Sequence, residues 1–333
     1  MTKSKMVAWF AAAFVATSAA PVAAVADACK LIRFASVDMA NVGDDPRVFV
    51  TATIGDEQRL FLIDSGTPIS TIQPDLVEKL HMITKELRGH RPVNSSGKNF
   101  RAIATIPALN VGGMQFATVR ALVDPDPEGS MYGGSLGADL LLHIDVEFDF
   151  AQHKVNFFSQ DHCPGRVVYW PHSKMAAVPM HIEPTGYPIL SVSLSGHDIN
   201  ALLDTGSTNT LLELNTATHD FGFSPDAANV TKVSGNEAEG MLYQQTFDSL
   251  DLSGIKLSNV PVLIHRDMAA EKMAEERDLD SRTGFGMTPQ ESNGVAPLTV
   301  GMQEMHSLHL YLAYKEKTLY VTPNESQASS VTH

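Results

Sequence analysis

Leu60-Phe61-Leu62-Ile63-Asp64-Ser65-Gly66-Thr67 in the first half of the chain is matched in the second half by Ala201-Leu202-Leu203-Asp204-Thr205-Gly206-Ser207. In each copy an apolar run of strand length ends in an aspartate, which a hydroxyl residue, a glycine and a second hydroxyl residue follow. Two carboxylates, one from each half, are suited to hold one water molecule between a paired acid and base. The pattern therefore predicts a hydrolytic site to which both halves contribute.

The two aspartate motifs belong to a longer internal repeat. An offset of 140 residues aligns them, and the same offset places residues 48–54 over 188–194 without a gap. A polar turn follows each of these stretches, so each copy is typical of a hairpin that leads into the aspartate-bearing strand. A second block, residues 135–157, aligns with residues 299–321, also without a gap. A repeat of this size is too long for a solenoid and predicts two related lobes.

On these residues the chain resembles the aspartic peptidases of the pepsin and retropepsin superfamily. In that family an apolar residue and a glycine follow the Asp-Ser/Thr-Gly-Ser/Thr motif, as Leu136-Gly137 and Val300-Gly301 do here. The segments Leu136–Leu141 and Asp145–Phe150 are typical of bacterial retropepsin-like domains, whereas two lobes in one chain are pepsin-like. The resemblance covers about residues 48–321. It implies a mainly β, bilobal acid-protease fold, with two related retropepsin-like β-barrel lobes and the active site between them.

The resemblance also assigns roles to the matched residues. Asp64 and Asp204 would share one proton and activate water as a pair. Gly66 and Gly206 would let the backbone turn sharply beside them. The remaining residues would support the active-site loops: the hydroxyls of Ser65 and Thr205 by cross-linking them, those of Thr67 and Ser207 by hydrogen-bonding the outer carboxylate oxygens, and Leu136, Gly137, Val300 and Gly301 by packing under them.

Two assignments have alternatives. The substrate-covering flap of pepsin-like enzymes carries a Tyr before Gly, and residues 68–131 of the first lobe have no such pair. The best flap candidate there is the polar stretch around Ser96 and Gly97, with Ser234 and Gly235 as its counterpart in the second lobe; ordinary exposed hairpins are the alternative. Gly286 could replace Gly301 as the packing glycine, but the ungapped alignment favours Gly301.

The first residues of the chain predict a secretory signal peptide. Two lysines precede a long apolar run, and Ala24-Val25-Ala26 is a small-x-small cleavage site, so we assign the signal to residues 1–26. An uncleaved anchor is the alternative. We therefore expect an exported protein, periplasmic or secreted, with no membrane insertion after cleavage. We assign the N-terminal lobe to residues 27–165, the C-terminal lobe to 166–322, a disordered tail to 323–333, and a charged helix to 267–278.

Charge and histidine placement narrow the set of partners. The formal net charge of −14 argues against nucleic acid and anionic membranes. The 13 histidines are scattered. The nearest pair, His306 and His309, is expected at the surface, and no Cys–His cluster has metal spacing. We expect no metal or other cofactor, a polypeptide substrate and a monomer.

The function that the resemblance implies is an aspartic-type endopeptidase, a hydrolase that cleaves an extended polypeptide in the cleft between the lobes. A catalytically silent peptide-binding or scaffolding protein of the same fold in the cell envelope is the alternative. Both motifs are intact, which argues against it. A processing protease with a single envelope substrate is a third reading.

The chain has two cysteines, Cys29 and Cys163, and an exported protein meets an oxidising compartment. We predict a disulfide between them, which would stabilise the fold by about 4 kcal/mol on a chain-entropy estimate. Mass spectrometry of exported, unreduced protein should find the cross-linked peptide pair. Two thiols that react with an alkylating agent would contradict the bridge.

Overall fold

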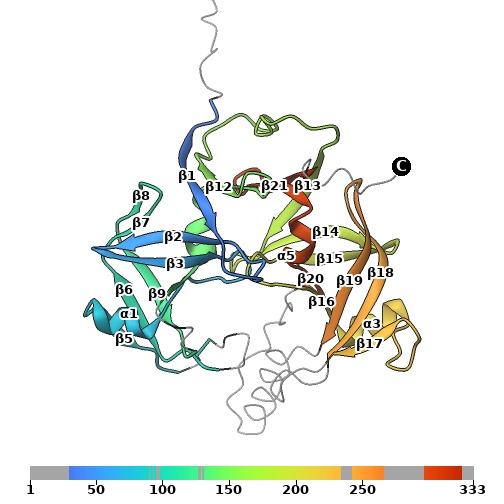
Figure 1. Ribbon diagram of the computed structural model, residues 1–333, viewed down its shortest axis with the longest axis horizontal. Helices are drawn as coiled ribbons and strands as arrows, with labels where there is room; N and C mark the ends of the chain where they lie inside the picture. The colour runs from blue at the N-terminus through green and yellow to red at the C-terminus, as the bar shows by residue number, and fades with distance from the viewer. Residues whose placement is uncertain are drawn as a thin grey trace, which may run out of the picture.

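The computed structural model describes residues 30–89, 91–92, 94, 98–126, 129, 131–233, 242–265 and 296–324. Within these ranges the chain is mainly β-strand, with a few short helices, as predicted. Figure 1 shows two lobes side by side, lobe one in blue to green and lobe two in yellow to orange, with a further sheet between and above them. The two-lobed, mainly β fold expected from the repeat is therefore confirmed.

Lobe one is a bent sheet with two helices. Its elements are β1 (Arg33–Ala40), β2 (Phe49–Ile54), β3 (Glu57–Ile63), β4 (Thr71–Ile72), α1 (Pro74–Lys79), β5 (Ile83–Glu86), β6 (Ala102–Ile106), β7 (Leu109–Val111), β8 (Met114–Phe116), β9 (Val119–Val123), β10 (Tyr132–Leu136) and α2 (Ala138–Leu141). The strands pair in the order β1–β2–β3–β10–β4–β9–β6–β5, and β7 with β8 joins at β2. The pairs β3/β10 and β4/β9 are parallel and the others are antiparallel.

Lobe two repeats this arrangement. Its elements are β13 (Ala176–Ile182), β14 (Pro188–Leu194), β15 (His197–Leu203), β16 (Thr210–Glu213), α3 (Leu214–Phe221), β17 (Val230–Val233), β18 (Leu242–Leu252), β19 (Ile255–His265), β20 (Leu298–Val300) and α5 (Met302–Met305). The order is β13–β14–β15–β20–β16–β19–β18–β17, with β15/β20 and β16/β19 parallel. The same strand order with the same two parallel pairs confirms the repeat predicted from the sequence.

A six-stranded antiparallel sheet joins the lobes. It adds β11 (Asp145–Asp149), β12 (Lys154–Phe158), β21 (Leu308–Ala313) and β22 (Thr318–Pro323) to the outer strands β1 and β13. The order is β1–β12–β11–β21–β22–β13. At its centre β11 of lobe one pairs with β21 of lobe two, with Glu147 opposite Tyr311. Main-chain hydrogen bonds therefore hold the two lobes in register.

The outer strands of this interlobe sheet each change partner to enter a lobe. β1 pairs with β12 as far as Asp38 and with β2 from Met39. β13 pairs with β22 as far as Pro179 and with β14 from Met180. Proline lacks an N–H and has a restricted φ, so it is suited to the point where one ladder ends and the next begins.

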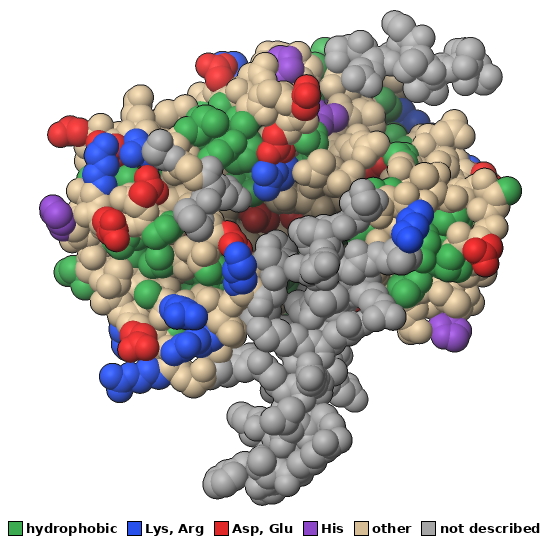
Figure 2. Space-filling view, turned by 60° about the horizontal axis from the view of Figure 1, so that its bottom comes forward, with side chains coloured by type: hydrophobic (Ala, Val, Ile, Leu, Met, Phe, Trp, Pro, Cys, Tyr) green, Lys and Arg blue, Asp and Glu red, His purple; other side chains and the backbone are tan. Residues whose placement is uncertain are grey.

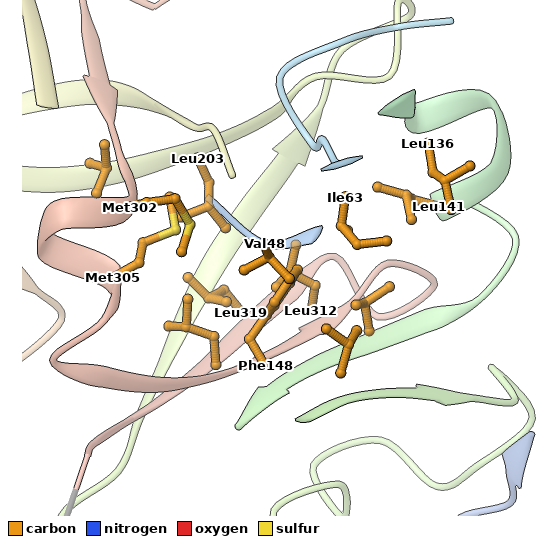
Figure 3. Close-up of a cluster of buried hydrophobic side chains, with 14 of the residues drawn as sticks. Val48, Ile63, Leu136, Leu141, Phe148, Leu203, Met302, Met305, Leu312 and Leu319 are labelled. Atoms are coloured by element: carbon orange, nitrogen blue, oxygen red, sulfur yellow. The ribbon is translucent and has the colours of Figure 1, made fainter. Parts of the chain in front are cut away.

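One apolar core runs through both lobes. Figure 3 shows Phe148, Leu312 and Leu319 of the interlobe sheet meeting Ile63 and Leu203, which directly precede the two aspartates. These five side chains are almost completely buried. Each contributes roughly 1.5–3 kcal/mol of transfer free energy, so the strands that carry the aspartates are anchored in the same core that joins the lobes.

Several predicted segments lie outside the described residues: the signal peptide at 1–26, Cys29, the charged helix at 267–278, and residues 325–333 of the tail that was assigned to 323–333. The strand β22 continues to Pro323. Among the residues that the structure describes, no helix is both long and apolar enough to span a bilayer.

The central position of Phe148 makes it a test of the shared core. Phe148→Ala should lower the free energy of unfolding by about 3–5 kcal/mol, because the neighbouring side chains cannot close the cavity. Ile83→Ala is the matched control, since Ile83 is 78% exposed, and should change stability by no more than about 0.5 kcal/mol. Chemical denaturation followed by circular dichroism measures both, and equal effects would contradict a core centred on Phe148.

Candidate active site

Each candidate aspartate follows the last residue of a strand that lies beside a parallel strand. The N–H of Asp64 donates to the carbonyl of Leu136 at the end of β10 (3.0 Å), and the N–H of Asp204 donates to Val300 at the end of β20 (3.1 Å). Each aspartate therefore begins a loop at the edge of its sheet. The repeat thus gives one such loop in each lobe, and both loops begin with the same hydrogen bond to the neighbouring parallel strand.

Reciprocal hydrogen bonds from two buried hydroxyl residues join the loops. The N–H of Ser65 donates to Thr205 Oγ1, and the N–H of Thr205 donates to Ser65 Oγ, both at 3.0 Å. Each hydroxyl also donates to a carbonyl of the opposite lobe, Ser65 to Leu203 (2.6 Å) and Thr205 to Ile63 (2.7 Å). Both residues are almost fully buried, so water cannot substitute for a lost partner and the two loops are fixed against each other.

The glycine of each loop lies against the carboxyl group of the other loop. The Gly66 N–H donates to Asp64 Oδ1 (2.9 Å) and the Gly206 N–H to Asp204 Oδ1 (2.8 Å). A Cβ on Gly66 would overlap the Asp204 carboxyl group, and one on Gly206 would overlap that of Asp64. Only glycine allows this approach. Figure 2 shows acidic side chains, in red, in the recess between the lobes.

The two aspartates share a hydrogen bond but differ in their surroundings. Burial, and then the charge of Asp204, raise the pKa of Asp64 well above its ordinary value. Burial also raises the pKa of Asp204, and the backbone of Gly206 and of Ser207, together with the hydrogen bond from Asp64, offset only part of that rise. The charge of Arg47 lowers the pKa of both. The pair therefore favours retention of one shared proton, and the rise in pKa is the larger at Asp64.

The two packing glycines lie under the loops in matching ways. Ala138 N–H, directly after Gly137, donates to the Thr67 carbonyl (2.8 Å). Met302 N–H, directly after Gly301, donates to the Ser207 carbonyl (2.9 Å). A Cβ would crowd Thr67 at the first glycine and overlap the Asn209 carbonyl at the second. Gly301 thus occupies the position matching Gly137, while Gly286 lies outside the described residues.

The structure corrects the role expected of the Ser207 hydroxyl. It donates to the carbonyl of Asn209 (2.9 Å) and not to the outer carboxylate oxygen, because that carbonyl lies within reach in the same turn. The backbone of Ser207 acts on Asp204 instead. Thr67 occupies the matching place in lobe one, where its carbonyl accepts the N–H of Ala138.

A second layer of support was not predicted. Ser70 Oγ donates to Asp139 Oδ1 (2.7 Å) and accepts the N–H of Gly137 (3.0 Å). In lobe two, Thr210 donates to the Glu304 carboxylate and accepts the N–H of Gly301 (3.2 Å). The 140-residue offset relates Ser70 to Thr210 and could have revealed them. The two acids do not align in the repeat, because Asp139 lies two residues after its packing glycine and Glu304 lies three residues after its own.

The flap candidates fall between consecutive antiparallel strands in both lobes. Ser96 and Gly97 lie between β5 and β6, and Ser234 and Gly235 between β17 and β18, and all four lie outside the described residues. At the base of the first hairpin, Asn94 Nδ2 donates to Asp126 Oδ2 (2.7 Å).

The expectation of a surface position is wrong for His309. Its side chain is nearly buried, its Nε2 contacts Glu147 Oε1 at 2.8 Å, and its ring stacks on Trp170 with centroids 3.9 Å apart. The neighbouring His306 is partly buried and contacts the Pro46 carbonyl at 2.6 Å. These partners come from distant parts of the chain. Among the described residues, no group of three or more His, Cys, Asp or Glu side chains is placed to hold a metal ion.

Comparison with known proteins gave three findings. A family model described as aspartyl protease matches residues 50–140 and 190–274, one region in each lobe. No curated protein matches the chain. Among solved structures, a crystal structure of basic 7S globulin from soybean is similar at 11% identity and a TM-score of 0.45, covering 91% of this chain and 98% of that one.

The reciprocal hydroxyl bonds predict strong coupling between the two loops. Ser65→Ala and Thr205→Val should each lower the free energy of unfolding by about 1–3 kcal/mol, because each leaves buried donors or acceptors without a partner. The double variant should lose less than the sum, with a coupling of about 0.5–3 kcal/mol. Urea unfolding of the four proteins measures the cycle. Ser191→Ala removes an exposed hydroxyl as the control, and additive losses at Ser65 and Thr205 would refute the coupling.

Proposed function

The chain belongs to the aspartyl protease family, and from that membership we propose that it is an endopeptidase that hydrolyses peptide bonds with a water molecule held between Asp64 and Asp204. The observation that carries the proposal is the pair of loops tied to each other by Ser65 and Thr205, with one carboxyl group on each. Such rigid support is what a paired acid and base need in order to act on one water molecule.

The unequal surroundings of the two carboxyl groups support distinct starting roles. Asp204, which accepts the N–H of Gly206 and the proton of Asp64, is the ionised member and would take a proton from the water as it attacks the scissile carbonyl carbon. Asp64 would donate its proton to the carbonyl oxygen. As the C–N bond breaks, Asp204 gives the proton it took from water to the leaving amine nitrogen, and a hydroxyl of the tetrahedral intermediate returns its proton to Asp64 as the product carboxyl group forms. This restores one proton on the dyad.

We infer an extended polypeptide as the substrate. Both lobes offer an antiparallel hairpin, β5–β6 and β17–β18, and an extended segment between them could form main-chain hydrogen bonds of the β type. The Asp pair activates water without a cofactor. The net charge of −14 argues against nucleic acid as a partner. We also propose that the protein is exported to the periplasm or the medium and that it is a monomer.

The shared proton predicts the kinetics of dyad variants. Asp64→Asn and Asp204→Asn should each abolish cleavage to a similar extent, and the double variant should be little worse, because each residue is half of one acid–base unit. Wild-type activity should follow a bell-shaped pH profile. Its alkaline limb should lie above the ordinary Asp value of about 4, because loss of the Asp64 proton inactivates the pair and the pKa of Asp64 is raised.

Cleavage of a peptide library by the full chain across acid to neutral pH measures these effects, with folding checked by circular dichroism. Asp75→Asn, on the first turn of α1, is the control and should retain activity. Wild-type turnover in either single dyad variant would rule out the shared-water mechanism. A folded wild-type protein that cleaves no peptide at any pH would favour the silent peptide-binding or scaffolding protein.

A further inference from the structure

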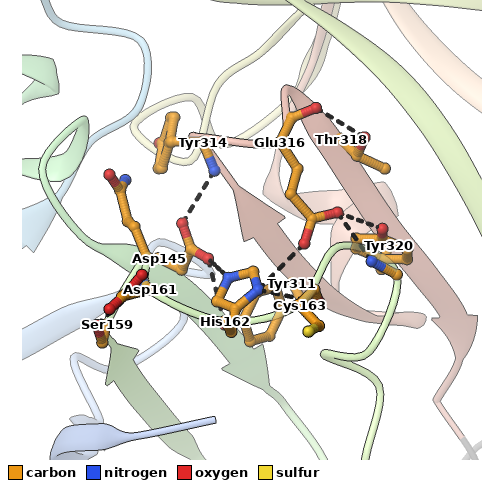
Figure 4. Close-up of polar contacts among 12 residues, drawn as sticks. Asp145, Ser159, Asp161, His162, Cys163, Tyr311, Tyr314, Glu316, Thr318 and Tyr320 are labelled. Carbon is orange, nitrogen blue, oxygen red and sulfur yellow. Dashed lines mark hydrogen bonds and ion pairs between the residues drawn. The ribbon is translucent and has the colours of Figure 1, made fainter. Parts of the chain in front are cut away.

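The crossover segment between β12 and β13, residues 159–175, carries a buried histidine to the interlobe sheet. Figure 1 shows this segment as the green loop above the sheet, away from the ends of β3 and β15 where the two aspartates lie. Figure 4 shows His162 between two carboxyl groups. One is Asp145 on β11 of lobe one, and the other is Glu316 in the turn between β21 and β22 of lobe two. The imidazole therefore bridges the lobes.

Both ring nitrogens of His162 face oxygen acceptors. Nε2 lies 2.5 Å from Asp145 Oδ2, and Nδ1 lies 3.2 Å from Glu316 Oε1 and 3.4 Å from the Cys163 carbonyl. The exposed fractions of the side chains are 2% for His162, 0% for Asp145 and 10% for Glu316. Glu316 Oε1 has no aligned hydrogen bond in the described part of the chain, so the ion-pair contact with His162 is what balances it.

The other polar groups that face Asp145 and Glu316 all donate hydrogen bonds to them, so both carboxyl groups act as acceptors. The donors are the Tyr314 N–H to Asp145 Oδ1 (3.0 Å), the Tyr311 hydroxyl to Asp145 Oδ2 (3.4 Å), the Tyr320 hydroxyl to Glu316 Oε2 (2.6 Å) and the Gly165 N–H to Glu316 Oε2 (3.1 Å). Burial raises the pKa of all three tyrosines, which therefore stay neutral. The next carboxylate on β11, Glu147, is paired with His309.

The three side chains need one proton more than a neutral imidazole and two carboxylates carry. A neutral imidazole has one N–H and one lone pair. With both carboxyl groups ionised, that lone pair would face a carboxylate oxygen in a buried site, which is unfavourable. One additional proton, on the imidazole or on a carboxyl group, removes the conflict. Burial raises the pKa of Asp145, which favours retention of such a proton.

We propose that His162 is a proton-dependent latch between the lobes, which joins Asp145 to Glu316 only while the three side chains together hold one additional proton. The latch is closed at acidic pH and opens as that proton leaves at alkaline pH. In the unfolded chain the same groups have ordinary values, about 6.5 for His and about 4 for Asp and Glu. Unfolding above about pH 6.5 therefore releases a proton. The stability that the latch contributes is complete between about pH 4 and pH 6.5 and is lost as the pH rises above that range.

The test measures the pH dependence of unfolding of two full-length proteins, one with the wild-type trio and one with Glu316→Gln. Both also carry Asp64→Asn, which removes the proton shared by the two active-site aspartates. The Gln amide N–H can donate to Nδ1 while its oxygen accepts from Tyr320 and Gly165, so this trio needs no additional proton. Between about pH 6 and pH 9, the unfolding constant of the wild-type trio should rise relative to that of Glu316→Gln by up to tenfold per pH unit, levelling off where the folded trio itself loses the proton.

His181→Gln is the matched control, because His181 is a 70% exposed histidine that contacts Glu183, and it should leave the pH slope unchanged. If Glu316→Gln does not fold, His162→Gln provides the same comparison. Equal slopes with and without the wild-type trio would overturn the latch. Because no cleavage is measured, this result stands or falls independently of the proposed protease activity.

Discussion

The reciprocal hydrogen bonds between Ser65 and Thr205 are the constraint on which the site depends. Each hydroxyl and each N–H of this pair finds its partner in the opposite lobe. Because both residues are buried, neither lobe can satisfy these groups alone. The bonds bring Gly66 and Gly206 so close to the opposite carboxyl groups that no side chain fits there. The shared proton of Asp64 and Asp204 follows from that proximity.

The interlobe sheet holds the two lobes in this arrangement, and it does so with several polar and charged side chains that are removed from water. Its central strands carry Asp145, Glu147, His309 and Tyr311, all nearly excluded from water. Buried charges are tolerated where each is paired and hydrogen-bonded, and here His162 and His309 supply partners for the two acids. Part of the acidic excess of the chain therefore lies inside the molecule and ties the lobes together.

The two aspartate loops differ in a few contacts, although their sequences repeat. A loop glycine and the charge of Arg47 lower the pKa of each aspartate, and the backbone of Ser207 lowers that of Asp204 further. Support under the loops also differs, with Asp139 behind Ser70 and the longer Glu304 behind Thr210. Two identical loops would raise both aspartate pKa values equally, and the backbone contact of Ser207 with Asp204 removes that symmetry.

The sequence by itself determined the fold and the main parts of the site. The offset of 140 residues relates both aspartates, both loop glycines and both cross-linking hydroxyls, because the residues that shape one loop are local and repeat with it. Only the tertiary structure decided which aspartate has the more strongly raised pKa, where the Ser207 hydroxyl points, and that His309 is buried. His309 meets Glu147 across 162 residues of chain, and His162 meets carboxyl groups from both lobes. Contacts of this kind leave no periodic pattern, since the lobe that supplies the partner is set by packing and not by the neighbouring residues.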